Sequence, residues 1–153
     1  MAELVPITRA NWRDAAAIRV GEGQLRFIAD YEPVALVILS KAFVRIGDLD
    51  WWPYLVKHAG YPVGVLTLAD ERQRNGQIAL SHLLIHADRQ RSGHGRAALR
   101  LVIDLARQLD GCERLRLTVH PDNHAAIDLY RSEGFTDDGV DNDGELRLSS
   151  SVS

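Results

Sequence analysis

Residues 83–98, with the sequence LLIHADRQRSGHGRAA, form the stretch that decides the fold. An apolar run gives way to an arginine-rich loop, and an alanine-rich helix start follows. The first turn of a helix presents unpaired backbone N–H groups and the positive end of the helix dipole. Gly93 and Gly95 let the backbone curl closely around an anion, because they carry no Cβ. The pattern predicts a phosphate-binding loop. A solvated connection is the alternative interpretation.

Two well-known phosphate motifs do not fit the surroundings of this loop. Gly93, Gly95 and Ala98 satisfy the dinucleotide pattern G-x-G-x-x-A. That motif needs further strand–helix–strand units, but only 58 residues follow Gly95, and His120 stands where an acidic residue is expected. A nucleotide-binding P-loop is also excluded, because no Gly-Lys-Ser/Thr follows the glycines.

A second segment, 119–135, reads VHPDNHAAIDLYRSEGF. Asn123 and Tyr130 are seven residues apart, so they share one face of a helix, and the small Ala126 lies between them. This combination predicts a groove wall that carries an amide and a phenol. Gly134 suits the left-handed position that ends a helix. For Tyr130 alone, a buried core aromatic is the alternative interpretation.

The rest of the chain predicts a mixed α/β fold with a sheet of six or seven strands. The run 33–46 fits a helix, although VALVIL within it also fits a buried strand. Asn75-Gly76 is a hairpin signal between two strands. The expected strands are 3–8, two within 54–69, 77–85, 114–119, 134–138 and 145–150, and the expected helices are 11–19, 23–30, 33–46, 94–109 and 123–133.

The loop and the later helix together resemble the GNAT N-acetyltransferase superfamily. Residues 90–95 match its Q/R-x-x-G-x-G/A loop, and 123–135 match N-x-x-A-x-x-L-Y-x-x-x-G-F. The resemblance implies a mostly antiparallel sheet, splayed between its fourth and fifth strands and flanked by about four helices. We expect one domain over 1–148 and a disordered tail at 149–153. Residues 11–30 and 61–68 look like the bacterial diamine and spermine/spermidine acetyltransferase branch.

The resemblance implies transfer of an acetyl group from acetyl-CoA to a primary amine by direct attack on the thioester. The backbone N–H of Leu83 or Leu84 would stabilise the oxyanion, and Tyr130 would donate a proton to the departing thiolate. Arg131 is a further candidate for a phosphate contact. The residues expected to bind the cofactor are Leu83, Leu84, Ile85, Gln90, Arg91, Ser92, Gly93, His94, Gly95, Arg96, Asn123, Ala126 and Tyr130.

The general base is where this chain departs from its relatives, because strand 77–85 offers Ser81 and His82 in place of an acidic residue. An unperturbed histidine titrates near neutral pH, so His82 is our candidate base or proton relay. His120 is a second candidate, and a water relay is a third. A structural histidine, half-buried in the strand, remains the alternative.

A polyamine or diamine acceptor requires acidic residues in its cleft. The N-terminal half offers Glu22, Asp30, Glu32, Asp48 and Asp50, each of which also fits an ordinary surface charge. Trp51 and Trp52 would wall the cleft and stack on a cation, or they would cap the core, and Ser81 would line the cleft. An antibiotic amine or a peptide N-terminus is an alternative acceptor. A non-catalytic acyl-CoA-binding sensor is an alternative function.

The amino-acid composition limits the partners and the cellular location that we expect for the chain. The net charge of −3 gives no electrostatic footprint for nucleic acid, and no apolar run reaches the length of a membrane span. The first residues lack the apolar region of a signal peptide, and the single Cys112 is typical of a reducing, cytoplasmic protein. The two H-x3-H pairs, at 82/86 and 120/124, do not predict a metal site. The superfamily resemblance allows a homodimer.

Overall fold

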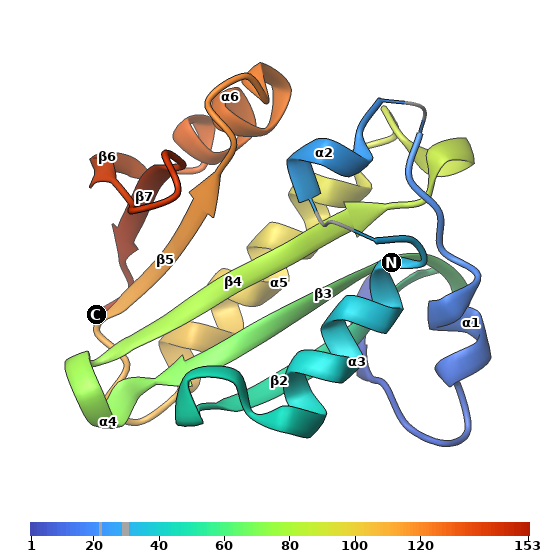
Figure 1. Ribbon diagram of the computed structural model, residues 1–153, viewed down its shortest axis with the longest axis horizontal. Helices are drawn as coiled ribbons and strands as arrows, with labels where there is room; N and C mark the ends of the chain where they lie inside the picture. The colour runs from blue at the N-terminus through green and yellow to red at the C-terminus, as the bar shows by residue number, and fades with distance from the viewer. Residues whose placement is uncertain (22, 29–30) are drawn as a thin grey trace.

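The computed structural model describes residues 1–21, 23–28 and 31–153. They form a seven-stranded sheet in the order β1-β2-β3-β4-β5-β7-β6, in which only the β4–β5 pair is parallel (Figure 1). This confirms the expected mixed, mostly antiparallel fold. The strands are β1 (Ala2–Pro6), β2 (Asp50–His58), β3 (Tyr61–Glu71), β4 (Gln77–Ile85), β5 (Arg114–Val119), β6 (Thr136–Val140) and β7 (Leu146–Ser151).

The helices cover both faces of the sheet. α5 lies behind the sheet in Figure 1, and α3 lies in front of it. Two buried clusters result, one between the sheet and α5 and the other between the sheet, α1 and α3. Neighbouring strand residues alternate between them, since Leu55 and Val65 face α3 whereas Val56 and Leu66 face α5. The described helices are α1 (Trp12–Ala16), α2 (Leu25–Ile28), α3 (Val34–Val44), α4 (Arg72–Asn75), α5 (His94–Gln108) and α6 (His124–Ser132), with 3₁₀ turns at Ile46–Asp48 and Ala87–Arg89.

The sheet opens between β4 and β5. These strands pair only from Gln77 to Leu80 and from Arg114 to Leu117, and they then diverge. Figure 1 shows the gap between the two strands widening toward α2 and α6. The splay expected between the fourth and fifth strands is therefore confirmed.

A β-bulge bends β4 at the start of this opening. Val65 pairs with Leu84 and Thr67 with Ser81, so β4 holds one residue more than β3 at this point. His82 lies in the extra step and has a left-handed backbone, with φ of 56°. Beside it, the strands approach so closely that a Cβ on Gly64 would collide with the Leu84 carbonyl oxygen. The bulge and this glycine therefore fix how the end of β4 turns toward the opening.

The run 33–46 is helical as predicted, over Val34–Val44, and not the alternative buried strand. Two local predictions need correction. The expected Asn-Gly hairpin contains a full turn of helix, α4, which ends on Gly76 with φ of 72°. The tail at 149–153 is not disordered throughout, because Ser149–Ser151 belong to β7 and pair with β5, while Val152 is buried. Three successive serines gave no strand signal in the sequence, because this part of β7 is held by its pairing with β5.

Candidate functional site

A cavity of about 680 Å³ lies at the open end of the sheet, between the end of β4, the loop before α5 and helix α6. Of the thirteen residues predicted to bind the cofactor, only the exposed Ser92 is not part of its wall. The other twelve line the cavity: Leu83, Leu84, Ile85, Gln90, Arg91, Gly93, His94, Gly95, Arg96, Asn123, Ala126 and Tyr130.

The loop before α5 has the geometry of an anion cradle. Gly93 is the N-cap of this 15-residue helix with φ of 79°, and Arg91 is also left-handed with φ of 63°. The N–H groups of the first helical turn and the positive end of the dipole therefore meet at this end of the cavity. A Cβ on Gly95 would make only ordinary contacts, at 3.7 Å from Leu129 and 3.8 Å from Ile85. This agrees with a motif that accepts glycine or alanine there.

Gln90 holds the loop in place. Its amide nitrogen donates to the Ile85 carbonyl at 3.0 Å and to Gln24 Oε1 at 2.7 Å. Gln24 returns a bond from its own amide nitrogen to Gln90 Oε1 at 3.0 Å. The side chain of Gln90 thus joins the loop to β4 and to the segment before α2. Gln24 was missed from the sequence, because no local pattern connects residues 66 positions apart.

The free edge of β4 offers backbone donors to the same cavity. His86 N–H donates to the Val63 carbonyl at 2.8 Å. Since bonded and non-bonded pairs alternate along an antiparallel ladder, the N–H of Leu84 turns toward β3, whereas those of Leu83 and Ile85 turn toward the opening. Of the two oxyanion donors that the sequence left open, this geometry favours Leu83.

The arginines near the cavity differ in what they contact. Arg91 lines the cavity, whereas Arg131 pairs with Asp137 at 2.8 Å and is not part of the wall. Arg96 lines the cavity and also bonds Glu133 and Ser132. The phosphate contact considered for Arg131 therefore has no support in the geometry.

Tyr130 and Asn123 take their positions from α6. Asn123 is the N-cap of the helix, and its Oδ1 accepts from the N–H of Ala126 at 3.4 Å. Tyr130 is 9% exposed, packs its ring against Phe135, and has its pKa raised by burial to about 12. The phenol therefore stays protonated at any physiological pH and can serve as a donor.

A second cavity, of about 600 Å³, meets the first. The two share Phe27, Leu83, Asn123, Ala126 and Tyr130, so Tyr130 stands at their junction. Ser81 and His82 line this second cavity. Because the sequence analysis predicted both residues for the acceptor side of the site, we call it the acceptor cavity. Its remaining lining residues are Arg26, Val37, Lys41, Thr118, Val119, Asp141, Asp143 and Glu145.

Of the two candidate histidine bases, only His82 lines the second cavity. Its Nε2 is 2.8 Å from Nζ of Lys41, which comes from α3 and also lies 5.5 Å from the centre of the Trp51 ring. His120 lines neither cavity. Its ring packs against Phe27 at 5.1 Å, and its Nδ1 accepts from the backbone N–H of Asp122 at 3.1 Å.

The expected acceptor residues are mostly elsewhere. Glu22 and Asp30 lie outside the described residues. Glu32 accepts from the Val20 N–H at 2.9 Å, and Asp50 pairs with Arg45 at 3.1 Å. Neither Glu32 nor Asp48 nor Asp50 lines the acceptor cavity. Trp51 and Trp52 line a separate cavity of about 450 Å³ with Pro6, Ile7, Pro53, Tyr54, Leu105 and Leu109, because β2 already begins at Asp50.

The acidic wall of the acceptor cavity comes instead from the β6–β7 turn. Asp141, Asp143 and Glu145 reach it, although the sequence analysis placed the first two between strands, placed Glu145 at the start of strand 145–150, and gave none of them a role in the site. Asp141 Oδ1 fixes this turn by accepting from the N–H groups of Asp143 and Glu145, both at 2.9 Å. The strand order β5-β7-β6 brings the turn to the opening, and that order cannot be read from local sequence.

The described residues lack two further kinds of feature. They contain no helix long and apolar enough to span a membrane. Within the same ranges, no three His, Cys, Asp or Glu side chains are grouped as metal ligands would be.

The known proteins that this chain resembles include several acetyltransferases. The chain is 32% identical over 83 residues to a probable spermine N(1)-acetyltransferase of Bacillus subtilis subsp. natto (strain BEST195), which covers 54% of this chain and 55% of the relative. The chain thus matches only about half the length of that curated relative. Two solved structures share the fold over nearly the whole chain.

The first is spermidine N-acetyltransferase from Vibrio cholerae in complex with CoA and spermine, at a TM-score of 0.77, 16% identity and coverage of 98% of this chain and 95% of that one. The second is aminoglycoside acetyltransferase AAC(6')-Ib in complex with coenzyme A, at 0.79 and 17% with coverage of 99% and 95%. The model of the acetyltransferase (GNAT) family matches residues 23–135. With the splayed sheet and the loop before α5, this match shows that the chain belongs to the acetyltransferase (GNAT) family.

Proposed function

We propose that the protein transfers an acetyl group from acetyl-CoA to a primary amine of a polyamine or diamine. The observation that carries this proposal is the junction at Tyr130, where a cavity with an anion-binding loop meets a cavity with an acidic wall. The likeness to a probable spermine acetyltransferase and to a spermidine acetyltransferase fold supports it.

The first cavity suits CoA. Gly93 and the first turn of α5 would hold the pyrophosphate, with Arg91 beside them. Leu83 and Ile85 would hydrogen-bond the pantetheine amides as an added strand would, since their N–H groups lie on the free edge of β4. This places the thioester near the junction of the cavities, where the N–H of Leu83 would stabilise the oxyanion.

Proton transfer is assigned to His82 in the second cavity and to Tyr130 at the junction of the two cavities. An aliphatic ammonium has a pKa of about 10.4, so about one molecule in 2,500 is a free nucleophile at pH 7. His82, which faces the acceptor cavity, would accept the amine proton directly or through a water molecule. Tyr130 would donate a hydrogen bond to the departing sulfur, because its phenol remains protonated.

The charges of the acceptor cavity favour a polycation. Its two cationic side chains have protein partners, since Arg26 lies over the Phe27 ring and near Asp122, and Lys41 contacts His82. By contrast, none of the described ion pairs involves Asp141, Asp143 or Glu145. These three carboxylates can therefore attract the distal ammonium groups of a bound polyamine.

The test is thiol release from acetyl-CoA with spermine, spermidine, a diamine, a monoamine and an aminoglycoside. We expect turnover of the polyamines. The double variant D143N/E145Q should raise KM for spermidine about three- to tenfold, with little effect on a monoamine, since each exposed charge pair is worth about 0.2–1 kcal/mol. Asp138→Asn is the matched control, because Asp138 is exposed on the same hairpin and does not line the cavity.

Three outcomes would contradict the proposal. If the enzyme acetylates an aminoglycoside or a peptide N-terminus faster than a polyamine, the proposed acceptor class is wrong. CoA binding without turnover of any amine would indicate a sensor. Failure to bind CoA would remove both the enzyme and the sensor. Substituting His82 by Gln should lower kcat more than it raises the KM for CoA, and an unchanged kcat would leave the base role to water.

A further inference from the structure

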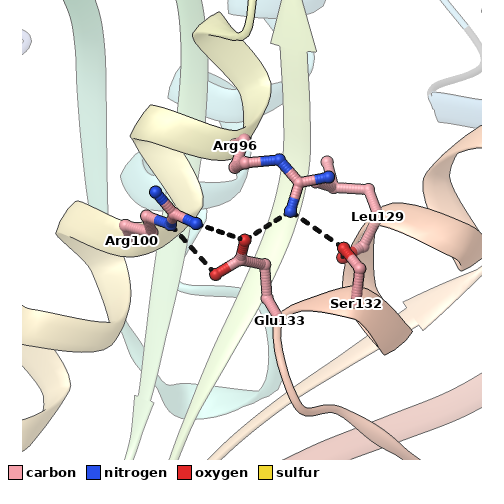
Figure 2. Close-up of polar contacts among 5 residues, drawn as sticks. All are labelled: Arg96, Arg100, Leu129, Ser132 and Glu133. Carbon is pink, nitrogen blue, oxygen red and sulfur yellow. Dashed lines mark hydrogen bonds and ion pairs between the residues drawn. The ribbon is translucent and has the colours of Figure 1, made fainter.

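Glu133, at the C-terminal end of α6, joins the two motif segments. Its carboxylate accepts from Arg96 Nη1, and from Arg100 Nε and Nη2 at 3.1 Å each (Figure 2). Both arginines come from α5. The Glu133 side chain is only 11% exposed, and the hydrogen bonds from Arg100 and Arg96 lower its pKa. Glu133 is therefore a charged group between the helix that begins at the anion cradle and the helix that carries Tyr130.

Ser132 completes the contact with Arg96. Its hydroxyl donates to the Leu129 carbonyl at 2.7 Å and accepts from Arg96 Nη1 at 2.9 Å (Figure 2). Both described bonds of Arg96 thus use the same terminal nitrogen. A guanidinium has five N–H donors in a rigid plane. The donors on Nε and Nη2 of Arg96 are left for a ligand, and Arg96 also lines the cofactor cavity.

We propose that Glu133 is a positioning residue for donor binding: with Ser132 it fixes one edge of the Arg96 guanidinium, so that the other edge faces a phosphate of CoA. This inference rests on the proposed function, because it assigns CoA to the cavity that Arg96 lines. A guanidinium whose orientation is already fixed loses less conformational entropy when it binds a phosphate. The family motif leaves position 133 unspecified, so the motif itself assigns no role to Glu133.

Two other roles of Glu133 give different results. If Glu133 competes with phosphate for Arg96, removing its charge would tighten CoA binding. If Glu133 only holds α5 against α6, the loss would be structural and would not depend on Arg96. The variant Arg100→Met distinguishes this last role from the proposed one. It removes a contact between α5 and α6 but keeps the contacts of Arg96 with Glu133 and Ser132.

The experiment is calorimetric titration of CoA into the native protein and the variants Glu133→Gln, Arg96→Met and their double combination. We expect Glu133→Gln to weaken CoA binding about two- to tenfold, which is the effect of leaving one long side chain to be ordered on binding. Arg96→Met should weaken it at least as much, and the double variant should bind no worse than Arg96→Met alone. Asp137→Asn, which breaks the ion pair between Arg131 of α6 and Asp137 of β6, is the matched control and should bind CoA as the native protein does.

A donor without the nucleotide gives a second measurement. With acetylpantetheine, native protein and Glu133→Gln should have equal kcat/KM. Ser132→Ala is a milder variant should Glu133→Gln fail to fold, and it should weaken CoA binding in the same direction. Unchanged or tighter CoA binding in Glu133→Gln overturns the inference, as does a double variant whose losses multiply. A native protein that does not bind CoA overturns the proposed function as well.

Discussion

Replacing Tyr130 by Phe removes the phenolic oxygen at the junction of the two cavities and keeps the ring that packs against Phe135. Burial raises the pKa of Tyr130 from 10.0 to about 12, which disfavours the phenolate by about 2.7 kcal/mol. A CoA thiolate resembles cysteine, with a pKa of about 8.5, so complete transfer of the phenolic proton to it would cost about 5 kcal/mol. In the proposed reaction the phenol would therefore stabilise the leaving sulfur as a hydrogen-bond donor and keep its proton, instead of transferring it as the sequence analysis expected.

This reasoning sets the size of the expected loss. A hydrogen bond to a charged group contributes about 1.5–3 kcal/mol, so Tyr130→Phe should lower kcat by about 10- to 150-fold. The KM for acetyl-CoA and the Tm should change little, since none of the described hydrogen bonds uses this hydroxyl. Tyr54→Phe is the matched control, because burial also raises the pKa of Tyr54, but Tyr54 lines the separate cavity beside β2. We expect that variant to keep its kcat.

The assay is thiol release from acetyl-CoA with spermidine between pH 6 and 10. Because the pKa of Tyr130 lies near 12, its ionisation should not reduce kcat anywhere in this range. The reasoning is refuted if Tyr130→Phe loses less than threefold in kcat. It is also refuted if the native enzyme loses activity between pH 8 and 9.5 in a step that the variant lacks, since the phenol would then titrate there.

Three further results are expected. Gly64→Ala should lower the free energy of unfolding by about 1–3 kcal/mol in urea denaturation, because its Cβ meets backbone, whereas Gly95→Ala should be tolerated. The pKa of His94 is lowered, first by burial and then by nearby positive groups. The unfolded chain therefore binds a proton at this residue more readily than the folded protein does. As a result, the free energy of unfolding should fall as the pH drops below about 6.5. His94→Gln should flatten that fall in urea midpoints measured against pH, and an unchanged slope would contradict the assignment. Glu71→Gln should lower the free energy of unfolding by about 2 kcal/mol, because the buried carboxylate accepts two hydrogen bonds from Arg116, at 2.7 and 2.9 Å. A Tm equal to that of the native protein would contradict this prediction.

What the sequence could reveal depended on how local each signal is. The anion cradle and the groove face of α6 could be predicted, because Gly93, Asn123 and Tyr130 act through backbone angles and helical spacing within a few residues. The fold followed from the resemblance that these motifs carry. The bulge at His82 could not be read, because it depends on how β4 pairs with β3.

The acceptor cavity was harder, because its wall is assembled from distant segments. Lys41 reaches it from α3, and Asp143 reaches it from the β6–β7 turn, through pairings that no local pattern encodes. Glu32 illustrates the opposite error: an acidic residue in the expected region serves a backbone N–H instead. Charge alone could not distinguish a substrate contact from a structural one.

Because β4 and β5 share only four residue pairs, the end of β4 has no partner strand on the β5 side, and the proposed function assigns a CoA molecule to this position. A molecule that binds along the end of β4 would raise the free energy of unfolding of the whole protein, by about 2.7 kcal/mol at a concentration one hundred times its Kd. Resistance to proteolysis should thus rise and fall with the supply of that molecule. Under the proposed function, the lifetime of the protein in the cell would then follow the concentration of its acyl donor.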